Sequence, residues 1–90
     1  MTAGLILKEM PTKERYAFAA GIVEGLAYAR FRKDSIAAGS KVETGMKCIT
    51  NWFYSEGSKT MLRIEEAFGS YPDYPPSAVI AVMAKKECGE

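Results

Sequence analysis

The stretch TKERYAFAAGIVEGLAYARFRK, residues 12–33, decides the fold class of this 90-residue chain. Its apolar residues recur in steps of three and four, which is the spacing of one face of an α-helix. They are Tyr16, Ala19, Ala20, Val23, Leu26, Ala27 and Phe31. Thr12 suits the N-cap position, and the carboxylate of Glu14 is favourable in the first turn. The pattern predicts a helix over about residues 13–33.

A second pattern lies within this helix. The small residues Ala17, Gly21, Gly25 and Ala29 are spaced four apart and therefore share one face. Each glycine inside a helix costs about 1 kcal/mol relative to alanine, so we expect a compensating contact. The pattern favours a tight helix crossing within the chain, and the alternative is the seam of a homodimer.

The middle of the chain gives weaker signals. Residues 34–47 are rich in small and polar residues and predict a loop, with room for one helical turn. Residues 48–57 fit either a short helix, with Ile49, Trp52 and Phe53 on its buried face, or an extended segment.

The C-terminal third predicts two more helices around a stiff loop. Ser58 suits the N-cap of a helix ending at Phe68, and Gly69 suits a left-handed stop. Three prolines restrict the loop over residues 69–76. A last helix is expected over residues 78–86. We therefore expect residues 1–90 to form an all-α, single-domain bundle of about four helices, in which residues 1–11 are an N-terminal segment.

Composition limits the function classes. The net charge is +1, from 12 basic and 11 acidic residues, so the basic excess of a nucleic-acid binder is missing. We interpret Arg30, Arg32 and Lys33 as a solvated helix end. The longest apolar run, residues 16–23, is far shorter than the roughly 20 residues that a membrane-spanning helix needs. We expect neither a nucleic-acid partner nor a membrane span.

Two cysteines and no histidine narrow the chemistry further. Without histidine there is no Ser-His or Cys-His nucleophile pair, and two thiolates are too few for an all-cysteine zinc site. We expect no enzyme, no cofactor and no metal. Cys48 and Cys88 instead favour a disulfide that clamps the C-terminal half, which implies an oxidising compartment. The alternative is two buried thiols in a cytosolic protein.

The order of segments resembles a known family. Cys48-Ile49, Tyr71-Pro72-Asp73, Pro76-Ser77-Ala78 and Cys88, together with the segment FAAGIVEGL at residues 18–26, carry the resemblance. They are similar to the Tai family of small periplasmic proteins, which includes immunity proteins against type VI secreted peptidoglycan amidases. The resemblance covers about residues 15–88. Two positions depart from the family pattern, because Thr50 and Glu87 stand where the family has proline.

This resemblance implies a periplasmic immunity protein that binds a cell-wall amidase by inserting a rigid loop into its groove. A signal sequence is not present in this chain, and its start, Met-Thr-Ala-Gly, is either native or replaces a signal that was removed. Tyr71, Asp73 and Tyr74 are the candidate partner-binding residues, with Trp52 and Tyr54 as weaker candidates. The alternative function is that of a periplasmic stress chaperone or a structural helical protein.

Overall fold

The computed structural model describes residues 1–56 and 58–90, and these residues form helices without any β-strand. The all-α prediction is confirmed, although the described residues form five helices, where about four were predicted. The helices are α1 (Ala3–Glu9), α2 (Thr12–Ala38), α3 (Thr44–Tyr54), α4 (Ser58–Ser70) and α5 (Pro76–Cys88).

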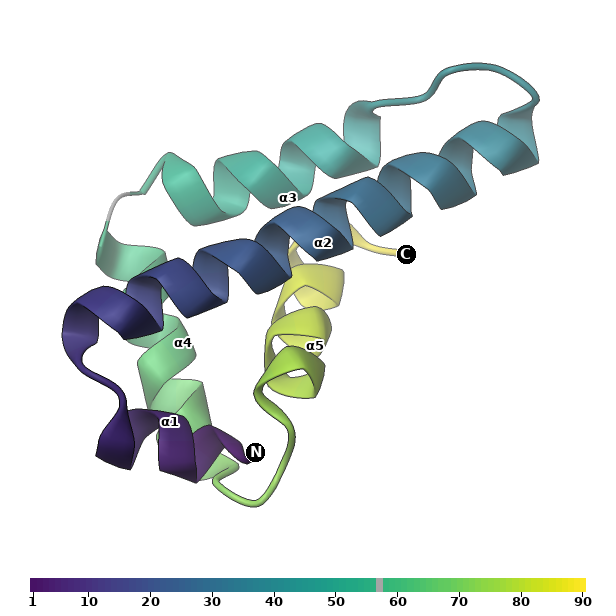
Figure 1. Cartoon of the computed structure of the whole chain (residues 1–90). Helices are drawn as coiled ribbons and strands as arrows, with labels where there is room; N and C mark the ends of the chain where they lie inside the picture. The colour runs from purple at the N-terminus through teal and green to yellow at the C-terminus, as the bar shows by residue number, and fades with distance from the viewer. Residues whose placement is uncertain (57) are drawn as a thin grey trace.

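Helices α2 and α3 form a long antiparallel hairpin, and α1, α4 and α5 lie to one side of it (Figure 1). Helix α2 continues past the predicted end at residue 33, because the alanines near its C-terminus favour the helix. It stops at Gly39, whose φ of 70° is left-handed. The prediction of a loop over residues 34–47 is therefore wrong for residues 34–38 and 44–47.

Helix α3 settles the ambiguous segment in favour of the helical alternative. Ile49, Trp52 and Phe53 are buried at helical spacing, as that alternative requires. Residue 57, the last of the predicted segment, lies outside the described residues.

The helix that was predicted to end at Phe68 is longer than expected, so its predicted end is wrong. Helix α4 runs through Gly69 to Ser70, and Gly69 does not adopt a positive φ. The next helix, α5, begins two residues earlier than predicted because Pro76 fits its first position. It ends at Cys88, so the second cysteine of the disulfide is the last residue of the helix.

Helix α1 was not predicted, because seven residues are too few to establish a helical period. Ala3 and Ile6 are buried. The guanidinium of Arg15, at the start of α2, joins three helices here. Its Nη1 donates to the Leu7 carbonyl at 3.1 Å, and its Nε lies 3.2 Å from Glu65 Oε2 of α4. These contacts hold α1 against the rest of the bundle.

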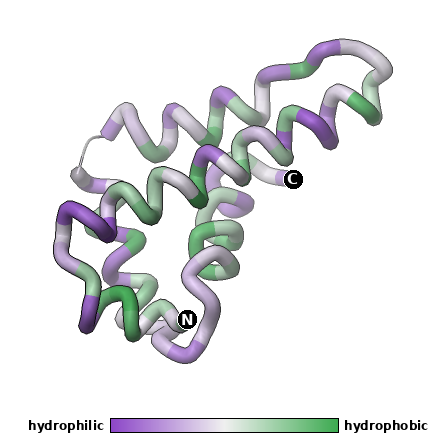
Figure 2. The backbone as a smooth tube through the Cα atoms, in the orientation of Figure 1, coloured by the Kyte–Doolittle hydropathy of each residue, from purple (hydrophilic) through white to green (hydrophobic). Residues whose placement is uncertain are grey.

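The core forms where the helices converge. Its largest fully buried apolar side chains come from four helices, and they are Val23, Phe53, Ile64, Phe68 and Ile80. Figure 2 shows apolar residues concentrated along the middle of α5, while the outer tip of the α2–α3 hairpin mixes hydrophilic and hydrophobic residues. Among the described residues, no helix has the length and hydropathy to span a membrane.

Candidate protein-binding surface

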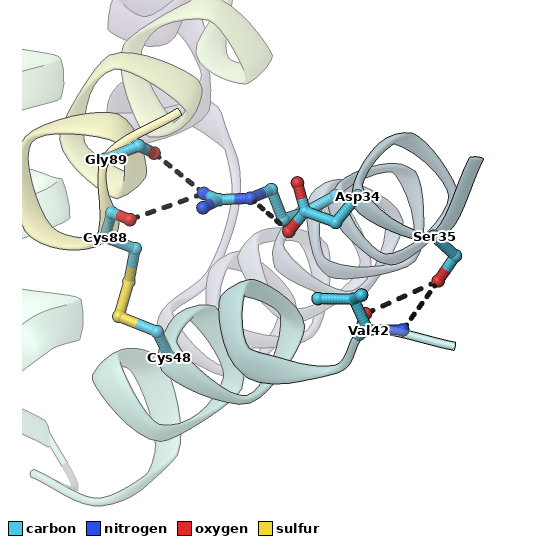
Figure 3. Close-up of polar contacts among 7 residues, drawn as sticks. Asp34, Ser35, Val42, Cys48, Cys88 and Gly89 are labelled. Atoms are coloured by element: carbon cyan, nitrogen blue, oxygen red, sulfur yellow. Dashed lines mark hydrogen bonds and ion pairs between the residues drawn. A yellow bond between two sulfur atoms is a disulfide. The ribbon is translucent and has the colours of Figure 1, made fainter. Parts of the chain in front are cut away.

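The disulfide between Cys48 and Cys88 confirms the predicted clamp. It joins α3 to the last residue of α5 across 40 positions of sequence, with a Cα–Cα distance of 5.8 Å (Figure 3). A cross-link that closes a loop of this length stabilises the folded state by about 4 kcal/mol in the chain-entropy model. It fixes the end of α5, which forms one wall of the surface described below.

Arg30 secures the same corner of the molecule. Its Nε donates to Asp34 Oδ2 at 2.8 Å, and its Nη1 donates to the Gly89 carbonyl at 2.8 Å and more weakly to that of Cys88 at 3.4 Å. A Cβ at Gly45 would lie only 2.6 Å from Arg30 Cζ, so glycine is needed to admit the guanidinium. The interpretation of Arg30 as part of a solvated helix end is wrong, because it satisfies carbonyls at the C-terminus of α5.

The loop between α4 and α5 is shorter than predicted, since it spans residues 71–75, and it presents an aromatic pair to solvent. Tyr71 and Tyr74 are 55% and 58% exposed, and their rings meet edge to face with centroids 5.9 Å apart. Asp73, between them, is also exposed. A turn bond from the Tyr74 N–H to the Tyr71 carbonyl, at 3.2 Å, closes the loop on itself. The structure thus brings together the three main residues that the sequence analysis selected.

Helix α1 holds this loop in place. The first N–H groups of a helix have no partner within it. In α1 the Ala3 N–H donates to the Tyr74 carbonyl at 2.8 Å, and the Gly4 N–H donates to the Pro72 carbonyl at 3.0 Å. A Cβ at Gly4 would lie 2.9 Å from Pro72 Cβ, so the close approach requires glycine. The sequence analysis missed Ala3 and Gly4, because it assigned no structure to the segment containing them.

A groove of about 470 Å³ opens beside the tyrosine pair, between the end of α4 and α5. Its walls are apolar or aromatic apart from one lysine, and they include Tyr71, Tyr74, Val79, Val82, Met83 and Lys86. Val82 is 52% exposed and presents an apolar side chain to the groove. Grooves of this size and lining are typical of binding sites.

The weaker candidates do not join this surface. Trp52 is only 9% exposed, and its carbonyl accepts a hydrogen bond from the buried Thr60 hydroxyl at 2.7 Å. Its prediction as a partner-binding residue is therefore wrong, because its side chain fills the core. Tyr54 is 43% exposed but lies at the other end of α4 from the loop, a helix length of about 20 Å.

Tyr54 makes a local contact instead. Its hydroxyl donates to Glu24 Oε1 at 3.1 Å, which links α3 to α2. Partial burial, followed by this hydrogen bond, raises the pKa of Tyr54 above its ordinary value.

The small-residue ridge does not pack within the chain. A Cβ added at Gly21 or Gly25 would meet nothing within 4 Å, and Ala17 and Ala29 are exposed. The predicted intrachain crossing is therefore wrong. Helix α2 uses a different small-residue face, Ala19, Val23 and Ala27, against the core.

Among the described residues, no three histidine, cysteine or carboxylate side chains gather as metal ligands would. A scan against protein-family models, a search of curated proteins and a search of solved structures each found no match to the chain. The resemblance to the Tai family therefore stays a prediction.

Proposed function

We propose that this chain is a non-enzymatic protein-binding domain, and that the loop over residues 71–75 with its adjoining groove forms the binding surface. One observation carries the proposal. Two exposed tyrosines sit on a proline-stiffened loop that α1 holds by hydrogen bonds, beside an apolar groove.

Rigidity matters because association must offset the entropy of ordering whatever moves at the interface. The bonds from Ala3 and Gly4 order the loop before a partner arrives. Tyrosine is among the residue types enriched at interface hot spots, since it offers a large apolar ring with a polar tip. The arrangement suits a partner that receives Tyr71 and Tyr74 and places an apolar side chain in the groove.

The partner class and the compartment come from the resemblance described above. We propose a cell-wall amidase delivered by type VI secretion as the partner, and blockage of its catalytic groove by the loop as the action. The periplasm is the proposed location, supported by the Cys48–Cys88 disulfide, because such bonds persist in oxidising compartments.

The test is a binding and inhibition assay against a panel of purified type VI peptidoglycan amidases. Wild-type protein should inhibit at least one of them at equimolar concentration. The double variant Tyr71→Ala/Tyr74→Ala should bind at least about thirtyfold more weakly, because the loss of a single hot-spot residue worth about 2 kcal/mol has this effect. Leu62→Ala is the matched control, because Leu62 on α4 is as exposed as Tyr71 at 55% and lies outside the groove.

The two parts of the proposal fail separately. If an amidase binds and the tyrosine variant, still folded by circular dichroism, binds equally well, the loop is not the binding surface. If no amidase in the panel is bound or inhibited, the immunity function is wrong, whatever the loop does.

A further inference from the structure

The outward face of α2 carries small and apolar residues that no other described helix covers. Helices packed on one side normally carry a polar face opposite. In α2 the apolar and small residues are spread around the whole circumference, while the buried positions occupy one side only. On the other side Tyr28 is 59% exposed, and Gly21 and Gly25 face open space.

This face, defined here as Glu14, Ala17, Gly21, Gly25, Tyr28, Ala29 and Arg32, forms one strip along the helix. At 100° per residue, its members fall within an arc of about 120°. All seven residues are exposed. Glu14 and Arg32, at its two ends, take part in none of the ion pairs among the described residues.

Six of the seven residues of the strip pair with one another when it is reversed, and Tyr28 has its counterpart at Phe18, outside the strip. Glu14 lies nine positions before Val23, and Arg32 lies nine positions after it. Ala17 and Ala29 form a second pair, each six positions from Val23. Gly21 and Gly25 form a third pair, each two positions from Val23. A two-fold axis at the level of Val23 would therefore place acid against base at both ends and small residues against small residues between them. Isologous contacts of this kind are the commonest way in which identical chains associate.

We propose that the outward face of α2 docks antiparallel on the same face of a second copy of this chain. Glu14 of each copy pairs with Arg32 of the other, and the glycines let the two helix backbones approach closely. The charge complementarity selects a second copy as the occupant and fixes the antiparallel direction.

The interface is small, which sets the strength of the association. The strip from residue 14 to residue 32 is about 27 Å long and about 10 Å wide, so a dimer buries roughly 600 Å² in total. Stable interfaces begin near 1,200 Å². The dimer is therefore weak, and it forms at high protein concentration. The strip shares no residue with the loop over residues 71–75 or with the groove beside that loop.

The test is sedimentation equilibrium from micromolar to millimolar protein. Glu14→Arg and Arg32→Glu each turn both end contacts into like-charge pairs and should raise the dissociation constant about tenfold. The double variant Glu14→Arg/Arg32→Glu exchanges the two charges and so restores the attraction. Its dissociation constant should return to near the wild-type value. Glu66→Arg on α4, another exposed glutamate, is the control and should change nothing.

A second variant tests the close approach. A Cβ at Gly21 would meet nothing within 4 Å, and leucine is a better helix former than glycine, so the Gly21→Leu monomer should stay folded while the dimer dissociates. A wild-type chain that remains monomeric throughout, or a double variant no better than the single reversals, would overturn the proposal.

Discussion

The glycines of α2 give a prediction whose sign and size both come from the structure. Gly21 and Gly25 lie in the middle of the helix without a positive φ, and a Cβ at either would meet nothing within 4 Å. Alanine at such a position removes the entropy that glycine loses on folding and gains about 0.5–1 kcal/mol. We expect Gly21→Ala/Gly25→Ala to raise the free energy of unfolding by about 1–2 kcal/mol.

For a domain of this size, 1 kcal/mol shifts Tm by about 4–8 °C, so the double variant should melt roughly 4–16 °C higher. Thermal unfolding followed by circular dichroism at low micromolar protein measures this gain in the monomer. At high concentration the gain should shrink, because the added methyl groups separate the two copies of α2.

Two other glycines serve as matched controls. Gly39 also has nothing within 4 Å, but its φ is +70°, so Gly39→Ala should destabilise through backbone strain alone. Gly45→Ala should destabilise through overlap with Arg30. The reasoning is refuted if the double variant at Gly21 and Gly25 lowers Tm at low concentration, since the two positions would then be packed.

Three further predictions concern the clamp, the loop and α3. Gly4→Ala should destabilise the fold by about 1–3 kcal/mol and speed amide exchange at residue 4, because its Cβ overlaps Pro72; unchanged exchange would contradict this anchoring. Cys48→Ala/Cys88→Ala should lower the free energy of unfolding in urea by about 4 kcal/mol, and alkylation of intact cells should leave both wild-type cysteines unmodified. The raised pKa of Tyr54 favours its neutral form in the folded state, so its contribution to stability is present below pH about 10 and lost as pH rises through the folded pKa. In Tyr54→Phe, the free energy of unfolding measured with urea should depend less on pH between pH 9 and 12 than in the wild type. An unchanged pH dependence would count against the hydrogen bond.

Much of the fold was predictable because single, simple properties of the sequence indicated it. The helical period around Val23 and the pairing of Cys48 with Cys88 each follow from one property of the sequence, apolar spacing or cysteine number. The exposed loop at Tyr71 and Tyr74 was predictable for the same reason, since its prolines exclude a helix whatever packs nearby.

The errors arose where a local pattern had two solutions. Helix α2 carries small residues four apart on two faces, and only the position of α3 and α5 decides that the face of Ala19, Val23 and Ala27 is buried and that of Gly21 is not. Similarly, α1 is too short to be recognised until α4 covers its apolar side. Its bonds to the loop are tertiary contacts that no local pattern encodes.

If the tyrosine loop binds a cell-wall amidase, site-specific photo-crosslinking should join the two proteins through that loop. A benzophenone side chain would replace Tyr74 in one protein and Leu62 in another, and adducts formed in cells that make the protein would be identified by mass spectrometry. The account predicts one dominant adduct from position 74, with a peptidoglycan amidase, and none from position 62. Equal adducts from both positions, or no amidase at position 74, would contradict it.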